Sequence, residues 1–315
     1  MSRNRVLIGS LSIMTMLFLI GPGFSRAASD DFEVDREVSV SDGQDSFHAV
    51  SSSAGYKVND RFDLMFSDGS LTLWYAQNAT ALSSPSWEFE LQFERLVEFQ
   101  DDGNGRFDAG DIIASSMDLT ERSYSMTYST VSLPMGGNET TITAVCDGGV
   151  LTLVFVITTS AAYADTVPIS PGEVKLGIMI HGYEFVGENT KLGLEMSINV
   201  DPGSALAYEE LDDSAQLNIT KSTMGGFFRW TDTALVDGVV APVNASLTAD
   251  TLTLSYPRGE SIVHDPVLGV RSVAPLSGPV AKVGIAGNVL MYFVGVAFAT
   301  AAVLAAVATR RSKNH

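Results

Sequence analysis

A long apolar run near the C-terminus, Val283 to Ala308, constrains this chain more than any other feature of its sequence. Its only markedly polar residue is Asn288. A helix rises about 1.5 Å per residue, so about 20 apolar residues cross the hydrocarbon core of a bilayer, and this run is longer than that. The sequence therefore predicts one transmembrane helix over residues 283–308.

Basic residues beside this run predict its orientation. Arg310, Arg311 and Lys313 follow the run at once, whereas Lys282 alone precedes it. Basic residues next to a span favour the cytoplasm, and a lipid-anchor signal whose tail is removed would not normally end in a basic cluster. We therefore expect a cytoplasmic tail over residues 309–315 and an extracellular domain before the helix, which is a single-pass type I topology in the cell membrane.

The first 28 residues are typical of a secretory signal peptide. Arg3 and Arg5 are followed by an apolar stretch from Val6 to Ile20, and the small residues Ala27 and Ala28 suit a signal peptidase. An N-terminal membrane anchor that is never cut is the alternative. Either interpretation exports the chain that follows.

The exported part is strongly acidic. The chain has 37 Asp and Glu residues against 19 Lys and Arg, a net charge of −18, and all the acidic residues lie between the two apolar ends. Such a surface repels nucleic acid, so we expect no nucleic-acid partner, and it favours solvation or the binding of cations. Cys146 is the only cysteine, which excludes a disulfide within the chain. We expect it to be a small buried apolar side chain.

Period-2 alternation of apolar and polar residues is common, and it is clearest from Trp87 to Phe99. This pattern predicts a long, half-buried strand with one face in a core and the other in solvent. The expected core face holds Trp87, Phe89, Leu91, Phe93, Val97 and Phe99, the expected solvent face holds Glu88, Glu90, Gln92, Glu94 and Glu98, and Arg95 and Leu96 break the rule.

Many further short strand patterns are separated by turn signals such as Asp68-Gly69, Asp147-Gly148-Gly149 and Asp237-Gly238. This arrangement predicts an all-β, antiparallel β-sandwich over residues 29–265. A loop-like stretch at residues 163–172 leaves open whether this is one large sandwich or two smaller ones. Residues 266–282 are rich in Pro, Gly and Ser, which indicates a stalk before the membrane helix.

An acidic loop from Gln100 to Asp111 follows the long strand. Its spacing resembles a twelve-position calcium loop, in which oxygen donors alternate and a glycine lets the chain turn around a hard cation. The predicted ligands are Asp102, Asn104, the carbonyl of Arg106, Asp108 and Asp111, with Gly105 at the turn.

Two positions depart from that pattern, and we expect calcium to have a structural role before a sensing one. Position 1 is Gln100, for which Asp101 is a substitute, and position 12 is Asp111 in place of the usual glutamate. A strand enters the loop where a helix is usual, so no helix-opening switch is expected. The alternative is an Asn104-Gly105 hairpin with a solvated acidic tip.

Candidate sites of other kinds are weaker. The sequons at Asn78, Asn138, Asn218 and Asn244 predict glycosylation of an exported chain. No motif of a hydrolase elbow, a zinc protease or a phosphate loop is present, so we expect no enzyme, although the many carboxylates leave a glycosidase pair open. Six aromatic residues are candidates for lining a sugar or peptide groove, and burial in a core is the simpler interpretation of their spacing. They are Trp74, Tyr75, Trp87, Phe227, Phe228 and Trp230.

Three stretches together resemble a known group of proteins. They are WEFELQFERLVEFQDDGNGRFDAGD, then EVKLGIMIHGYEFVGENTKLGLEMSINV, and then FFRWTDTALVDGVVAPVNASL followed by LTLSYPRGESIVHDPVLGV. Their order is similar to that in uncharacterised, membrane-anchored archaeal cell-surface proteins with a β-rich ectodomain. The resemblance implies the same architecture and the acidic loop, and it carries no biochemical activity.

These features predict a non-enzymatic, calcium-stabilised cell-surface protein that serves envelope structure, adhesion or ligand display. Its expected partners are the membrane, through the C-terminal helix, and a surface glycan or protein ligand. A carbohydrate- or solute-binding surface receptor is the alternative, and an envelope glycoside hydrolase comes third.

Overall fold

The computed structural model describes residues 36–42, 46–53, 61–76, 86–134, 136–164, 167–222 and 224–272. The predicted signal peptide, membrane helix and tail lie outside these residues, as does Asn78. Every regular element within them is a β-strand, and all the strand pairs are antiparallel, so the predicted all-β, antiparallel class is confirmed. No helix long and apolar enough to cross a membrane occurs in the described ranges.

The first large sheet has nine strands. Its order is β1 (Arg36–Asp42), β2 (Ser46–Ser53), β3 (Arg61–Ser67), β4 (Ser70–Ala76), β5 (Ser86–Gln100), β13 (Lys191–Val200), β20 (Thr251–Pro257) and β19 (Asn244–Thr248). The ninth strand, β6 (Ile112–Asp118), pairs with the second half of β5, beyond the part that pairs with β4. The length of β5 therefore lets it hold two different neighbours along one edge.

The second large sheet has eleven strands. One run is β14 (Ala205–Glu210), β15 (Ser214–Lys221), β16 (Met224–Thr231), β22 (Val267–Ser272), β12 (Glu173–His181), β21 (Ser261–His264), β17 (Thr233–Val236) and β18 (Val239–Pro242). On the other edge of β12 lie β9 (Leu151–Thr158), β8 (Asn138–Cys146) and β7 (Tyr124–Ser132). A small separate hairpin joins β10 (Ala162–Ala164) to β11 (Val167–Ile169).

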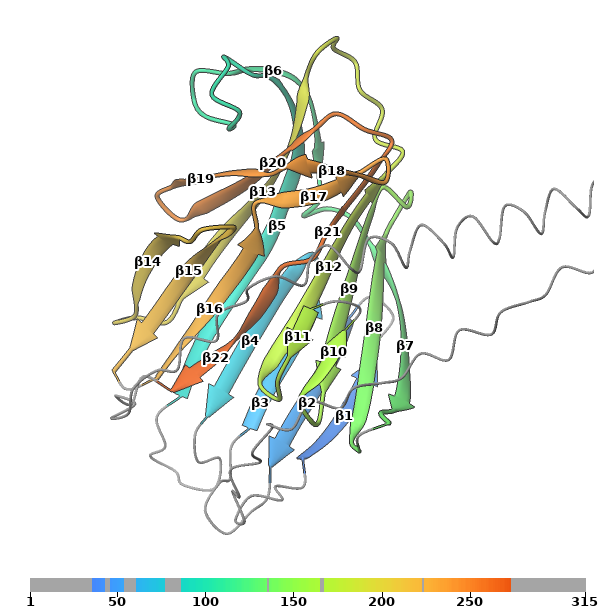
Figure 1. Cartoon of the computed structure of the whole chain (residues 1–315), viewed down its shortest axis with the longest axis vertical. Coiled ribbons are helices and arrows are strands. Elements are labelled where there is room, and N and C mark those ends of the chain that lie inside the picture. The colour runs from blue at the N-terminus through green and yellow to red at the C-terminus, as the bar shows by residue number, and fades with distance from the viewer. Residues whose placement is uncertain are drawn as a thin grey trace, which may run out of the picture.

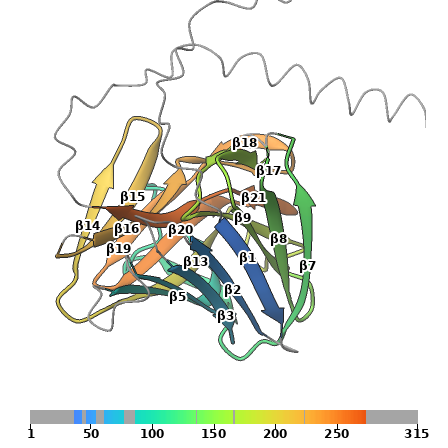
Figure 2. The same cartoon turned by 90° about the horizontal axis from the view of Figure 1, so that it is seen from below.

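The two large sheets lie one over the other, as Figures 1 and 2 show. Phe155 of β9 contacts Phe47 of β2 and Phe66 of β3, with ring centroids 5.1 and 5.6 Å apart, so side chains of both sheets meet in one core. That core extends from Phe47 to Leu268. Strands from both sides of residues 163–172 pair with each other, β9 with β12 and β5 with β13. Both halves of the chain therefore build the same sheets.

Strand β22 corrects the first part of the predicted stalk, because residues 267–272 pair with β12 and β16 in the middle of a sheet. Residues 273–282 of that stalk lie outside the described residues. Pro266 lies between β21 and β22, and its carbonyl accepts a hydrogen bond from the backbone of Leu176 at 2.8 Å. A proline lacks the donor that a ladder needs, so it suits the break between two strands. The Pro-rich composition correctly indicated a break between strands at Pro266, but it gave no indication of the strand that follows.

A β-bulge in β5 corrects the predicted faces of the long strand. The pairing with β13 shifts by one residue at Glu94, so Arg95 pairs with Glu195 while Phe93 pairs with Met196. An extra residue in one strand moves every later side chain to the opposite face. Leu96 consequently joins the core between the sheets. Val97 and Phe99 are fully buried, as predicted, but lie outside that core cluster.

Three local predictions are confirmed. The turn residues Asp68 and Gly69 both have positive φ, 52° and 72°, and so do Asp237 and Gly238, at 53° and 76°. Positive φ at both central residues is the signature of the two-residue hairpin turn that these sequences favour. Cys146 is buried, with 1% of its surface exposed.

Candidate metal centre at one end of the nine-stranded sheet

The acidic loop joins β5 to β6 at the upper end of the molecule in Figure 1. Phe107 fastens it to the sheet, because its ring lies 5.1 Å from that of the buried Phe99. The backbone of Phe107 donates to Ser255 Oγ at 3.0 Å and accepts from Ser246 Oγ at 2.7 Å. Ser255 and Ser246 belong to β20 and β19, so three strands fix the loop.

Gly105 turns the chain inside this loop. Its φ is 82°, where a side chain is strained, and a Cβ at this position would lie 2.8 Å from Nδ2 of Asn244. Its backbone N–H donates to Asp101 Oδ1 at 2.8 Å. The predicted turn glycine is thus required both for its conformation and for close contact with β19.

Three carboxylates come together within the loop. Asp101, Asp102 and Asp111 each offer an oxygen, and these oxygens all lie within 4.8 Å of one another. Asp111 also braces the loop, because its Oδ1 accepts from the backbone of Asp102 at 3.1 Å and its Oδ2 from the backbone of Asp108 at 2.9 Å. This arrangement includes two of the predicted ligands and adds Asp101, the substitute for position 1.

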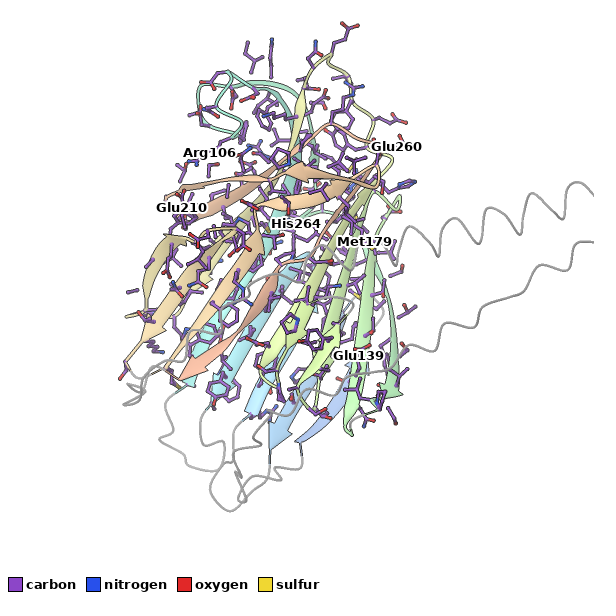
Figure 3. The ribbon with its side chains drawn as sticks, viewed as in Figure 1. Arg106, Glu139, Met179, Glu210, Glu260 and His264 are labelled. Carbon is purple, nitrogen blue, oxygen red and sulfur yellow. The ribbon has the colours of Figure 1, made fainter. Side chains whose placement is uncertain are left out.

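The other predicted ligands lie beside this group. Asn104 Nδ2 donates to Asp108 Oδ2 at 2.9 Å, and Asp108 Oδ1 accepts from the backbone of Gly110 at 2.7 Å. The guanidinium of Arg106 lies 3.7 Å from Oε1 of Glu210, and both residues are labelled in Figure 3. Asn104 and Asp108 therefore stabilise the second half of the loop.

Lys191 belongs to the candidate site, although the sequence did not single it out. Its Nζ lies 2.8 Å from Asp101 Oδ2, and this hydrogen bond, with others from the backbone of Gly105 and Gly103, holds the pKa of the Asp101 carboxyl below its usual value. The register that places Lys191 opposite Phe99 brings it to the loop. One lysine thus compensates one of three neighbouring negative charges.

Glu98 lies just before the loop and is fully buried, although its place in the alternation predicted solvent exposure. The bulge at Glu94 explains the difference. Oε1 accepts from Gly187 N at 2.8 Å and from Thr190 Oγ1 at 2.5 Å. Oε2 accepts from Val186 N at 2.9 Å and from Ser115 Oγ at 2.8 Å. Each oxygen of the Glu98 carboxylate thus accepts two hydrogen bonds from neutral donors.

The pKa of Glu98 reflects the same contacts. Burial raises the pKa of its carboxyl, but the hydrogen bonds from Thr190, Val186, Gly187 and Ser115 outweigh burial and leave the pKa below its usual value. Hydrogen bonds that favour the charged form of an acid act in this direction. Glu98 is therefore an ionised structural group that holds residues 186–190 against the sheet.

The aromatic residues considered for a binding groove are mainly core residues. Trp87, Phe227, Phe228 and Trp230 are each no more than 2% exposed. Trp74 is half-buried on β4, and the guanidinium of Arg61 lies 6.0 Å from its ring centroid. The alternative of an aromatic sugar groove gains no support from these buried rings.

The sequons differ in accessibility. Asn138 is exposed at the start of β8. Asn218 is half-buried within β15, and its Nδ2 donates to Oε2 of Glu209 at 2.9 Å. Asn244 is half-buried, and its Nδ2 faces Gly105. A glycan therefore fits best at Asn138.

The described site offers oxygen donors and no nitrogen or sulfur ligand near the three carboxylates. Oxygen-only ligands suit hard cations such as calcium and magnesium. Comparison with known proteins found no match: no protein-family model matches the chain, and no curated protein is similar to it.

Proposed function

We propose that this chain is a non-enzymatic, calcium-stabilised β-sandwich displayed on the cell surface, with a role in envelope structure, adhesion or ligand display. The observation that carries the proposal is the group of carboxylates formed by Asp101, Asp102 and Asp111. Two face-to-face sheets with one core support the sandwich architecture.

Charge balance supports a cation at this group. Like charges within a few ångströms disfavour ionisation of one another, and an added cation removes that penalty. Lys191 contacts Asp101, whereas Asp102 and Asp111 receive hydrogen bonds from backbone N–H groups of the loop. A calcium ion accepts six to eight oxygens, so water would complete a set built from these three side chains.

The position of the loop agrees with a tethered protein. Strand β22, the last described strand, ends at the lower end of the molecule in Figure 1, whereas β6 and the acidic loop lie at the upper end. A membrane helix at residues 283–308 would therefore attach the domain by its lower end. The acidic loop would then face away from the membrane, and Asn138 is the sequon best placed for a glycan.

Thermal unfolding of the full chain in detergent tests the calcium proposal. A ligand that binds only the folded state stabilises it by RT ln(1 + [L]/Kd), so a Kd near 10⁻⁴–10⁻³ M predicts about 1–3 kcal/mol at about 10 mM calcium. This corresponds to a rise in Tm of roughly 3–10 °C for a domain of this size.

Variants locate the effect. Asp102→Ala combined with Asp108→Ala, and separately Asp102→Asn with Asp111→Asn, should abolish the rise. The matched control is Asp68→Asn at the exposed β3–β4 turn, which should retain it. Magnesium should give a smaller rise, because it requires near-octahedral geometry. A melting curve that calcium leaves unchanged, or an equal rise in all variants, would refute the site.

A further inference from the structure

Strand β7 ends one side of the eleven-stranded sheet, and its outer edge is unpaired. β8 is the only described strand that pairs with it, over nine residues and without a shift in register. Asp147 N donates to Ser123 O at 2.8 Å beyond one end of this ladder, and Leu133 N donates to Gly137 O at 2.9 Å beyond the other. The odd-numbered residues of β7 therefore bond to β8, because hydrogen-bonded and non-hydrogen-bonded pairs alternate along an antiparallel ladder.

The even-numbered residues of β7 consequently direct their backbone groups away from β8. Each offers one N–H and one C=O at the open edge, which are the groups that a further strand would pair with. These residues are Tyr124, Met126, Tyr128, Thr130 and Ser132. An edge with such a row of unpaired groups is a template for pairing with another chain.

The other described edge strands of the two large sheets have features that discourage such pairing. β1, β6 and β14 each contain at least one Asp or Glu, and β18 has four residues and ends in Pro242. β19 has only five residues. β7 has nine residues and no charge, proline, glycine or bulge. Charges, prolines and short length are the usual protection of an edge, so their absence from β7 favours pairing.

One end of β7 is covered by the nine-stranded sheet and the other end is open. The even-numbered side chains share one face of the strand. On this face Tyr124 is 1% exposed, and its ring centroid lies 5.0 Å from that of Phe66 in the nine-stranded sheet. Farther along, Tyr128 is 49% exposed, and Thr130 and Ser132 are also exposed. A lone peptide strand paired with β7 would leave this open end uncovered.

We propose that two copies of this chain pair antiparallel through β7, with Tyr128 of one copy opposite Tyr128 of the other. This register places Met126 opposite Thr130 and Tyr124 opposite Ser132, so every outward N–H and C=O of β7 has a partner. Such a two-fold contact uses the same strand of both copies. The open end of β7 then lies beside the end that the nine-stranded sheet of the second copy covers.

The charges of the chain agree with a second copy at this edge. The net charge is −18, so two copies repel each other at long range. Like charges directly opposite each other on paired strands destabilise the pair further. β7 carries no charge, so two copies can pair here without that second cost.

The antiparallel register gives the proposed adhesion role a specific geometry. β7 runs along the long axis of the molecule in Figure 1, and an antiparallel copy points the opposite way. This step rests on the proposed membrane helix at residues 283–308, which would attach each copy by its lower end. The two copies would then extend from two facing membranes.

Disulfide formation by the full chain in detergent tests the pairing, because the single native cysteine is buried. Tyr128→Cys should form a dimer on mild oxidation, since the Cα atoms of a hydrogen-bonded pair lie about 5.5 Å apart and a disulfide spans that distance. Ser132→Cys is the matched control, because Ser132 is exposed on the same strand and the two thiols of a dimer would lie about 27 Å apart. The chain is produced without glycosylation, because a glycan at Asn138 would lie beside Ser132.

Three results would overturn the pairing. The first is equal dimer formation by both variants, which contact through the apolar C-terminal run alone would give. The second is no dimer from Tyr128→Cys although a mono-maleimide labels its thiol. The third is a Tyr128→Cys thiol that resists labelling and forms no dimer, since something other than a second copy would then cover the edge.

Two double variants test the register. The proposed pairing places Thr127 opposite Ser129 of the second copy, and both side chains are exposed. Added to Tyr128→Cys, Thr127→Glu with Ser129→Glu puts like charges opposite each other and should reduce the dimer fraction at least about ten-fold. Thr127→Glu with Ser129→Lys puts opposite charges there and should retain the dimer. Equal dimer fractions in the two double variants would contradict the register.

Vesicles test the arrangement on facing membranes. Phosphatidylcholine vesicles that hold the full chain should aggregate, as measured by turbidity, and vesicles that hold the Thr127→Glu, Ser129→Glu chain should stay dispersed. Disulfide-linked pairs in detergent without aggregation of loaded vesicles would overturn this arrangement. A chain that pairs in detergent but does not insert into vesicles would contradict the membrane anchor and support the pairing.

Discussion

Two carboxylate sites that lie three residues apart in the chain differ in how their negative charge is stabilised. Glu98 is fully buried and accepts four hydrogen bonds from neutral donors. Asp101, Asp102 and Asp111 lie in the next loop, partly or fully exposed, and crowd three negative charges around one lysine. The first site has one negative charge that four hydrogen bonds stabilise. The second has three negative charges and only one neighbouring positive charge.

The contrast shows which carboxylates the protein stabilises with its own hydrogen-bond donors and which of them a bound cation would stabilise. A buried carboxylate completed by backbone and hydroxyl donors gains nothing from a cation. A group of carboxylates gains stability from each positive charge that it binds. We therefore expect the 186–190 segment to be insensitive to calcium and the 101–111 loop to respond to it.

The largest effect should come from Glu98→Ala. This change leaves four donors without their acceptor, of which the hydroxyl of Thr190 is buried and the other three are partly buried. An unsatisfied buried group costs about 1–3 kcal/mol before relaxation. We expect the free energy of unfolding to fall by roughly 3–5 kcal/mol in urea titrations, with or without calcium.

Glu88→Ala is the control for this variant, because Glu88 is exposed on the same strand. Its loss should stay within about 0.5 kcal/mol. Equal losses for the two variants would show that Glu98 has no special structural role.

Phe107→Ala should have an intermediate effect. The ring is half-buried against Phe99 and holds the acidic loop on the sheet. Complete burial of Phe is worth about 3–5 kcal/mol on truncation, so a half-buried ring predicts a loss of about 1–2 kcal/mol. Calcium titrations followed by Tm should also require more calcium, because the loop loses its support. An unchanged calcium response would mean that the loop holds its shape without this contact.

Acid should weaken the two carboxylate sites through Glu98 and Asp101, whose pKa values are lowered in the folded state. Such groups contribute stability above their unfolded pKa, near 4, and that contribution is lost as pH falls through the folded pKa. The difference in unfolding free energy between the native chain and Glu98→Gln should therefore shrink as pH falls from about 5 to 3. A difference that grows on acidification would mean that the folded pKa of Glu98 is raised.

The smallest effect should come from Lys191→Met. Without calcium the loss of one partly exposed ion pair should cost a few tenths of a kcal/mol. With calcium the rise in Tm should be larger than in the native chain, because the ion no longer competes with a lysine at Asp101. Lys191→Arg should behave as the native chain does, and a smaller calcium rise in Lys191→Met would contradict the competition.

Local signals predicted much of this fold. Alternation gave β5 to within one residue at each end, and the Asp-Gly pairs gave two hairpin turns, because both depend on residues close in sequence. The acidic loop was also visible from its spacing. Each of these features follows from the preferences of a short segment.

The remaining features depend on contacts between distant residues. The bulge at Glu94 is set by pairing with β13, about a hundred positions later, and it decides that Glu98 is buried and Phe99 faces the loop. Lys191 reaches Asp101 by the same pairing. The proline-rich composition around Pro266 suggested a stalk in place of strand β22. This strand is defined by its pairing with β12 and β16, which are distant in sequence. Composition alone carries no information on such partners.

Direct calcium binding tests the central proposal most sharply. Calorimetric titration of the full chain in detergent should show one bound calcium per chain with a Kd of about 10⁻⁴–10⁻³ M. Asp102→Asn with Asp111→Asn should remove the binding, and Asp68→Asn should retain it. No heat of binding at millimolar calcium, or the same binding in the double variant, would contradict the account.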